Sequence, residues 1–298
     1  MNKIIKNILF PLSKVLPDKI YLTIEYWYFM GEKINWNNPK TYNEKIQWLK
    51  INDRNPLYTS LVDKYEVKQY MEQIIGKEYI IPTYGVWDSY EDIPFNELPN
   101  EFVLKCTHDS GSVFLIKDKN TINHDELKKT IKKSLNNNFY WFGREWPYKN
   151  IKPRIIAEYM LKHNGDILDY KVFSFNGKAK ALFVASDRNN KDVETKFDFY
   201  NIDFEPLNII NGHPNSGKKL KRPANLKKMI ELTELITKGI PQARVDFYEV
   251  DKKLYFGEIT FFHWSGFKRF EPNYWDEIFG DWIDLNCLNN SRSGMEKE

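Results

Sequence analysis

In several stretches of the chain, apolar residues recur three or four positions apart, which is the spacing of one face of an α-helix. Residues 38–52 have this pattern, and Thr41 and Glu44 have the spacing of a capping box at its start. A second helical pattern occupies residues 61–75 and ends at Gly76. We therefore expect the chain to be helical before its first strand.

Shorter apolar runs bounded by glycine, proline or polar residues predict β-strands. These runs cover residues 79–87, 154–160, 168–177, 180–187 and 196–201. Residues 101–118 have the pattern of two strands joined by a glycine-containing turn, and Asn123 caps the helix that follows. A polar connection over 209–225 leads to a helix at 226–239. This mixture predicts an α+β protein.

The order of these elements predicts three segments. Residues 1–60 form a helical N-terminal region, and residues 61–150 form a compact α+β lobe. Residues 151–298 form a larger lobe that contains the hairpin pattern of residues 243–267.

That hairpin brings two acidic residues together. If the three polar residues 251–253 form its loop, antiparallel pairing places Asp246 directly opposite Glu258, and Arg244 shares the face of Asp246. The face of Glu258 would also contain Phe256. Like charges in facing positions repel each other. A protonated carboxyl, a basic neighbour such as Arg244, or a divalent cation would offset this repulsion.

Two interpretations of this pair remain. The carboxylates are hydrated on an exposed face of the hairpin, or they bind Mg²⁺, which predicts phosphate oxygens nearby. Apolar residues flank Glu258 on both faces of its strand, which favours the metal. On this argument Asp246→Asn and Glu258→Gln leave the metal-free protein as stable as before or slightly more stable, because each removes the repulsion.

Residues that suit phosphate binding occur between 103 and 115. Lys105 stands at a strand end, and the turn at Ser110, Gly111 and Ser112 presents backbone N–H groups without large side chains. The spacing of a Walker loop is absent from this stretch. An ordinary turn explains the glycine alone; together with the carboxylate pair, these residues indicate a nucleotide site.

Composition narrows the class of protein. With 42% hydrophobic residues among 298, the chain can fill a sizeable core. The 44 basic and 41 acidic residues leave a net charge of +3, so we expect no nucleic-acid partner. Cys106 and Cys287 lie far apart, which is typical of a cytoplasmic protein. Residues from Ile4 to Val15 fit a basic amphipathic helix, packed on the core or resting on the inner face of the membrane.

Several stretches, in their order along the chain, resemble the ATP-grasp ligases. In particular, "NPKTYNEKIQWLKIND", "DKYEVKQY", "REWPYKNIKPRIIAEYM" and "RVDFY…YFGEIT" look like the TupA-like ATP-grasp family, named for teichuronopeptide synthesis and found among polysaccharide-biosynthesis proteins. The resemblance extends over about residues 38–285. It implies an ATP-grasp fold in which two α+β lobes clasp MgATP, preceded by a helical N-terminal region.

The resemblance also implies which residues bind the nucleotide. The lysines expected at the phosphates are Lys64, Lys105 and Lys171. The glycine-rich loop expected to cover the phosphates consists of Asp109, Ser110, Gly111 and Ser112. The backbone expected to contact adenine is that of Glu158, Tyr159 and Met160. Asp169 is expected to hold the ribose.

The resemblance also implies which residues bind the metal and which take part in the reaction. Asp246 and Glu258 correspond to Mg²⁺ ligands, and Thr260 stands where the family usually has asparagine, so the number of ions stays open. Arg244 and Lys105 correspond to residues that neutralise developing charge, and Gly266 lies in a turn that helps to hold an acyl intermediate. His263 is expected to line the pocket or to belong to an aromatic core.

The reaction implied by the resemblance joins a carboxylate to an amine at the expense of ATP, through an acyl phosphate. The expected substrates are an amino acid or small amine and a carboxylate borne by a uronic-acid surface glycan or its precursor. Two alternatives stay open: a phosphotransferase that uses the same fold, and a non-catalytic glycan-binding or membrane-scaffold protein with a degenerate nucleotide site.

Overall fold

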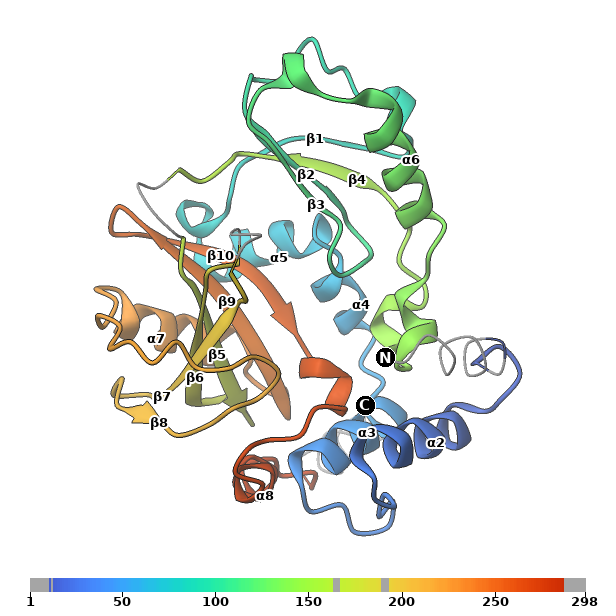
Figure 1. Ribbon diagram of the computed structural model, residues 1–298, viewed down its shortest axis with the longest axis vertical. Helices are drawn as coiled ribbons and strands as arrows, with labels where there is room; N and C mark the ends of the chain where they lie inside the picture. Colours follow the sequence, from blue (N-terminus) through green and yellow to red (C-terminus); the bar gives the residue numbers. More distant parts are fainter. Residues whose placement is uncertain (1–10, 12, 163–166, 189–192, 287–298) are drawn as a thin grey trace, which may run out of the picture. The chain divides into compact units, whose positions relative to one another are not determined.

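The computed structural model describes residue 11 and residues 13–162, 167–188 and 193–286 (Figure 1). The chain divides into two compact units: the small unit, Asn55–Lys162, and the large unit, which comprises the other described residues. The sequence predicted boundaries after residues 60 and 150, whereas the structure places them after Arg54 and Lys162. Each unit combines helices with one antiparallel sheet, which confirms the α+β class.

The small unit contains a four-stranded sheet, the small sheet, in the order β1–β4–β2–β3. Its elements are α4 (Leu57–Val62), α5 (Glu66–Ile75), β1 (Thr83–Trp87), β2 (Phe102–Cys106), β3 (Val113–Ile116), α6 (His124–Leu135) and β4 (Ile155–Glu158). Although β4 comes last in the sequence, it lies between β1 and β2 and pairs with both. The strand predicted at 154–160 therefore completes this unit.

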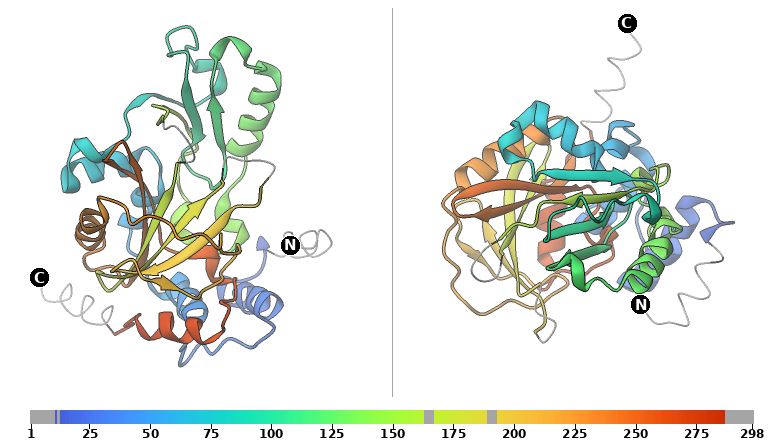
Figure 2. Two further views of the ribbon diagram at one scale, coloured as in Figure 1. Left: turned by 60° about the vertical axis from the view of Figure 1, so that its left-hand side comes forward. Right: turned by 90° about the horizontal axis from the view of Figure 1, so that it is seen from above.

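The two faces of the small sheet have different surroundings. Phe102 and Leu104 belong to a buried apolar cluster that includes Leu127 and Ile131 of α6. The α6 helix lies beside this sheet (Figure 2). Strand alternation places Lys105 on the opposite face, together with its cross-strand neighbour Val113 and with Leu115. Val113 and Leu115 are 47% and 44% exposed, so an accessible apolar surface adjoins Lys105.

The helix predicted over residues 61–75 is two helices, α4 and α5, with a break that begins at Asp63. Asp63 Oδ1 accepts hydrogen bonds from the backbone N–H groups two and three residues later, at 2.8 and 3.0 Å, and so caps α5. The prediction of one helix is wrong because this capping interaction competes with helix continuation. Lys64 consequently lies in the break, where its backbone N–H donates to the Thr107 carbonyl at 3.0 Å.

The large unit contains a six-stranded sheet, the large sheet, in the order β10–β9–β5–β6–β7–β8. Its elements are α2 (Asp18–Met30), α3 (Tyr42–Asn52), β5 (Asp169–Phe175), β6 (Lys178–Ser186), β7 (Lys196–Asn201), β8 (Pro206–Leu207), α7 (Leu226–Ile236), β9 (Gln242–Val250), β10 (Lys253–Thr260) and α8 (Tyr274–Asp281). The predicted capping box of α3 is confirmed, since the side chains of Thr41 and Glu44 each bond to the other's backbone.

The α7 helix lies against one face of the large sheet, beside β5 and β6 (Figure 1). Ser174 Oγ lies 2.7 Å from Thr237 Oγ1 just after α7, and the register places the fully buried Val245 on this face. On the opposite face, Phe173 packs edge-on against Phe279 of α8, with ring centroids 5.4 Å apart. Both faces of the central strands are therefore largely buried.

The β9–β10 hairpin pairs Asp246 with Glu258 as predicted, but by a different route. The turn consists of Asp251 and Lys252, whose φ values of 50° and 63° are those of a tight two-residue hairpin turn. A bulge at Gly257 then shifts the register by one residue. The shorter turn and the bulge compensate, so the predicted carboxylate pair still forms.

The same bulge corrects one expectation about the faces of β10. Simple alternation placed Phe256 on the face of Glu258, but Phe256 pairs with Phe247 and is 3% exposed. The Glu258 side chain is 49% exposed and lies on the other face. The bulge thus lets one strand bury its apolar residues and still present its carboxylate.

In the described part of the chain, no helix has both the length and the apolar character needed to cross a membrane. The amphipathic helix predicted from Ile4 to Val15 lies mostly outside the described residues.

Candidate active site

In the small unit, a buried ion-pair cluster centres on Glu158 at the end of β4. Its side chain is 4% exposed and contacts two ammonium groups, that of Lys105 at 2.5 Å and that of Lys68. Burial opposes ionisation, but the two positive charges outweigh it and hold the pKa of Glu158 below its ordinary value. Lys68 of α5 was not predicted; its signal in the sequence is its position four residues after Lys64, which lies in the break before this helix.

The segment predicted to contact adenine begins at this cluster. The Glu158 carboxylate is engaged by the two lysines, and Tyr159 is 39% exposed. The Tyr159 backbone N–H donates to the Pro82 carbonyl at 2.9 Å, which ties the end of β4 to the chain just before β1. The role of Glu158, Tyr159 and Met160 at adenine stays a prediction.

We expect Lys105→Ala to weaken MgATP binding about tenfold or more, because it removes a charge-assisted contact to phosphate. The fold should persist, since Lys68 still neutralises Glu158. Titration calorimetry measures the affinity. Lys152→Ala is the matched control: it removes a lysine of the same unit that is 65% exposed and paired with Asp88. Equal affinities of both variants and the parent would show that Lys105 does not meet the phosphates.

The glycine-containing turn of the small unit is fixed at two points. The Lys64 ammonium group donates to the Asp109 carbonyl and lies 3.8 Å from Asp109 Oδ1. Ser112 Oγ donates to the Asp109 carboxylate and lies 2.7 Å from Ser134 Oγ of α6. At Gly111, φ is 105°, and no heavy atom of the described residues outside its chain neighbours would lie within 4 Å of an added Cβ. The tip of the turn is thus open while its base is held.

We predict that the turn becomes more protected when nucleotide binds, because a loop that covers phosphates must open for their exchange. Amide hydrogen exchange of residues 107–113 should slow on addition of MgATP, whereas a peptide from α7 in the large unit serves as the internal reference. Equal exchange of the turn with and without MgATP would contradict its role as a lid.

In the large unit, Arg244 joins the two hairpin carboxylates. Its Nε lies 2.6 Å from Asp246 Oδ1 and its Nη2 lies 2.8 Å from Asp246 Oδ2, which is a bidentate pair. Nη2 also lies 3.2 Å from Glu258 Oε1 and 3.1 Å from Thr260 Oγ1. Of the ways to offset the carboxylate repulsion that the sequence left open, the structure contains the basic neighbour.

A second cation extends the cluster along β5. The Lys171 ammonium group contacts the Asp246 carboxylate and lies 2.7 Å from Asp169 Oδ2. Arg188, which follows β6, also contacts Asp169, whose side chain is 1% exposed. Asp169, expected to hold a ribose, is therefore engaged by two basic side chains. Arg188 was missed because its partner lies nineteen residues away in sequence and meets it only through strand pairing.

Charge pairing dominates the electrostatics of this cluster. Burial by itself raises the pKa of Asp246, but the adjacent Arg244 and Lys171 outweigh it and hold that pKa well below its ordinary value. Burial likewise lowers the pKa of Arg244, but Asp246 and Glu258 raise it above its ordinary value. Both Arg244 and Asp246 are consequently ionised at neutral pH.

The turn that contains Gly266 lies against α3. Trp264, Ser265 and Gly266 all have left-handed φ values, of 50°, 56° and 63°. A Cβ on Gly266 would lie 2.6 Å from Gln47 Nε2 and from Ile46 Cγ2, so glycine permits the close approach of the helix. The turn is therefore packed closely against α3 in the large unit.

The role of Asp246 and Glu258 as ligands of a magnesium ion stays a prediction. They occupy facing positions, and the half-exposed Glu258 carboxylate is open to solvent. Among the residues that the structure describes, no group of three or more histidine, cysteine or acidic side chains could hold a metal by itself. Mg²⁺ typically takes one or two carboxylates and fills its other positions with water and phosphate oxygens, which matches this pair.

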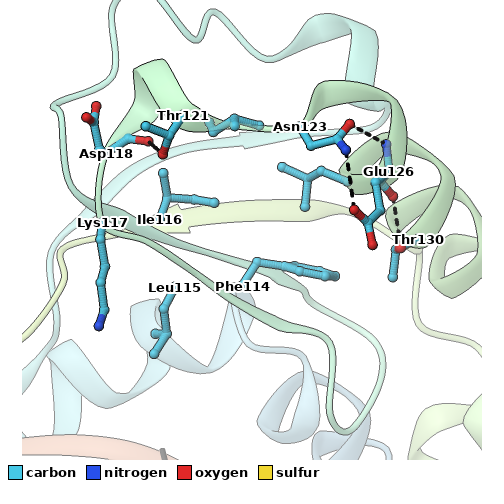
Figure 3. A pocket seen from close by; sticks show the side chains of 11 residues that line it. Phe114, Leu115, Ile116, Lys117, Asp118, Thr121, Asn123, Glu126 and Thr130 are labelled. Atoms are coloured by element: carbon cyan, nitrogen blue, oxygen red, sulfur yellow. Dashed lines mark hydrogen bonds between the residues drawn. The ribbon is translucent and has the colours of Figure 1, made fainter.

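A pocket of about 480 Å³ lies elsewhere in the small unit, between β3 and the start of α6 (Figure 3). Phe114 and Ile116 line its apolar side, and Asn123 and Glu126 of the α6 cap line its polar side. It is lined by none of the residues predicted to bind nucleotide, so it is separate from the candidate site.

One α+β unit has a lysine-bearing sheet face beside a glycine turn, and the other has an Arg-x-Asp hairpin; both agree with the expected ATP-grasp fold. The model of the TupA-like ATPgrasp family matches residues 44–284. The chain belongs to this family.

Two solved ligase structures are among those similar to the chain. The L-amino acid ligase from Bacillus licheniformis is 14% identical with a TM-score of 0.50, over 91% of this chain and 62% of that one. D-alanine–D-alanine ligase from Bacillus anthracis in complex with ATP is 18% identical with a TM-score of 0.41, over 69% and 56%. The chain thus spans less than two thirds of either ligase. A search of curated proteins finds no match.

Proposed function

We propose that this protein is an ATP-dependent carboxylate–amine ligase that forms an amide through an acyl phosphate. The observation that carries the proposal is the buried Arg244, held by two carboxylates on the large sheet of an ATP-grasp protein. A fixed positive charge beside two carboxylates that suit Mg²⁺ is an arrangement that stabilises a phosphoryl group in transfer.

The proposed reaction has two steps. A carboxylate oxygen of the first substrate attacks the γ-phosphorus of ATP, the bond to the β,γ-bridging oxygen breaks, and ADP leaves with the electron pair. The amine nitrogen then attacks the acyl carbon, phosphate leaves with the oxygen that came from the carboxylate, and the nitrogen loses a proton. No covalent bond to the protein is required.

The side chains have distinct proposed roles. Arg244 and Lys171 neutralise charge on the transferring phosphoryl group without having to reorganise, because their carboxylate partners already hold them. Asp246 and Glu258 would hold Mg²⁺, which supplies positive charge to the phosphate oxygens when it is bound. In the small unit, Lys64, Lys105 and the turn at 109–112 serve the ATP phosphates.

We further propose a class of substrate. The carboxylate is that of a uronic acid in a surface polysaccharide or its precursor, and the amine is an amino acid or another small amine; the reaction takes place in the cytoplasm. The support for this part is the resemblance of the sequence to polysaccharide-biosynthesis proteins.

The test is ADP release in a coupled assay, with a uronic-acid disaccharide as the carboxylate and each of the common amino acids in turn as the amine. Sustained ADP release by a ligase requires both substrates, because the amine consumes the acyl phosphate, and mass spectrometry then finds the condensation product. A phosphorylated saccharide formed without amine would indicate a phosphotransferase. Failure to bind MgATP in calorimetry would favour a non-catalytic glycan-binding or scaffold protein.

A further inference from the structure

Arg244 also contacts a histidine that lies outside the carboxylate cluster. Its Nη1 lies 2.7 Å from Nδ1 of His263, in the turn that follows β10. A guanidinium group can only donate hydrogen bonds, so Nδ1 must present its lone pair. His263 is therefore neutral, and its proton is on Nε2.

Asn211 requires the same arrangement from the other side of the ring. Its Nδ2 donates to the carbonyl oxygens of Lys268 and Arg269, at 3.2 and 3.0 Å, so its Oδ1 must face the ring. That Oδ1 lies 3.1 Å from His263 Nε2 and accepts the Nε2 proton. The chain of hydrogen bonds runs in one direction only, and it fixes one tautomer of the imidazole.

The surroundings keep the ring neutral and immobile. His263 is 3% exposed, and its ring packs against Phe173 and Phe183 with centroids 5.1 and 5.5 Å apart. Burial and the positive charge of Arg244 hold the pKa of His263 well below its ordinary value. Because both ring nitrogens are engaged and solvent is excluded, His263 does not serve as a general base.

The backbone at His263 is also fixed, from the side of α3. Gln47 Nε2 donates to the carbonyl oxygens of Ser265 and Gly266, at 3.0 and 2.8 Å. The ammonium group of the fully buried Lys50 donates to the Ser265 carbonyl at 2.7 Å. The imidazole thus extends from a turn that two buried side chains hold in place.

We propose that His263 is a positioning residue for Arg244. Asp246 accepts hydrogen bonds from Nε and Nη2 on one edge of the guanidinium group, and His263 accepts one from Nη1 on the other. The guanidinium group therefore cannot rotate about the Asp246 carboxylate. A fixed guanidinium plane keeps its charge directed at the phosphoryl group throughout the reaction. This inference rests on the proposed ligase function, but the tautomer it requires is a property of the protein alone.

The tautomer is tested directly by NMR of the protein with ¹⁵N-labelled histidine. The chain has five histidines, and the spectrum of His263→Asn identifies the resonances of His263 by their loss. The expected spectrum shows a neutral ring protonated on Nε2. A proton on Nδ1, or a charged ring at neutral pH, would overturn the proposal whether or not the protein is a ligase.

The matched variants His263→Asn and His263→Leu test the consequence for catalysis. The two side chains are similar in size, but only asparagine offers an acceptor near the position of Nδ1. We expect kcat for ADP release to fall about a hundredfold in His263→Leu and the KM for ATP to change little, as for a displaced catalytic group. His263→Asn should recover most of the lost rate, within about tenfold of the parent.

Phe279→Leu is the control for packing, since it loosens the same aromatic cluster through Phe173 without touching Arg244. It should lower the melting temperature and leave kcat close to the parent value. Equal rate losses in the asparagine and leucine variants of His263, both folded by thermal melting, would contradict positioning through Nδ1. No ADP release by the parent protein would count against the proposed function, and the NMR result would still decide the tautomer.

Discussion

Asp246→Asn should abolish ATP-dependent amide formation and lower the free energy of unfolding by about 3 kcal/mol. The Asp246 side chain is 1% exposed, and it neutralises both Arg244 and Lys171. Asparagine keeps the shape but leaves these two buried cations without their main counter-charge. Denaturant unfolding without nucleotide measures the stability, and ADP release measures the activity.

Glu258→Gln is the matched partner of this variant. Glu258 is 49% exposed and has one contact with Arg244, at 3.2 Å, so its removal should change stability by less than about 1 kcal/mol. Activity should still be lost, because a ligand for the phosphate-bound cation is gone. An active Asp246→Asn enzyme would contradict the assigned role, as would a Glu258→Gln protein that loses more stability than Asp246→Asn.

The pH dependence of stability gives a second test of the role of Asp246. The pKa of Asp246 is lower in the folded protein than in the unfolded chain, so its stabilising contribution is present above about pH 4 and is lost as pH falls toward the folded-state value. The parent should lose stability more steeply than Asp246→Asn over that acidic range. Parallel stability curves would show that Asp246 is not held ionised by its partners.

The sequence alone gave the opposite expectation for metal-free stability. The predicted hairpin has two carboxylates in facing positions, which repel each other, and Asp246→Asn would relieve that repulsion. The structure adds Lys171, which comes from another strand, and shows that Arg244 bridges both carboxylates. Two cations beside Asp246 change the sign of the predicted effect.

Arg244→Lys should lower kcat for ADP release about a thousandfold, the scale seen when a fixed electrostatic donor is removed from an active site. A lysine retains the charge but cannot form the bidentate pair with Asp246 and at the same time reach Glu258 and His263. Steady-state kinetics with saturating ATP measures the effect.

Arg54→Lys is the control for this substitution, since Arg54 is 41% exposed and pairs with Asp18 at the surface of the large unit. It should leave kcat unchanged. If Arg244→Lys retained more than about a tenth of the parent rate, charge alone would suffice and the fixed guanidinium geometry would have no catalytic importance.

Local patterns in the sequence predicted much of the fold because they depend on neighbouring residues. The capping box at Thr41, the Asn123 cap of α6 and the hairpin that joins β2 to β3 all follow from residues a few positions apart. The pairing of Asp246 with Glu258 was predicted correctly from an incorrect turn, because the bulge at Gly257 made up the difference.

Features that depend on contacts between distant segments could not be predicted in this way. The position of β4 between β1 and β2 is set by sheet pairing across many residues, and no local pattern encodes it. Lys68 and Arg188 acquire their acidic partners only when distant segments come together. Lys68 of α5 meets Glu158 of β4, and Arg188 after β6 meets Asp169 of β5. His263 gave no sign of its bond to Arg244 for the same reason.

The most direct test of the proposed ligase activity follows a single oxygen atom. The carboxylate substrate is labelled with ¹⁸O, supplied with MgATP and the amine that supports ADP release, and the inorganic phosphate is analysed by mass spectrometry. An acyl phosphate predicts one ¹⁸O atom in each phosphate released, in amounts equal to the amide formed from a fully labelled carboxylate. Unlabelled phosphate, or label that stays in a phosphorylated saccharide, would contradict amide formation through an acyl phosphate.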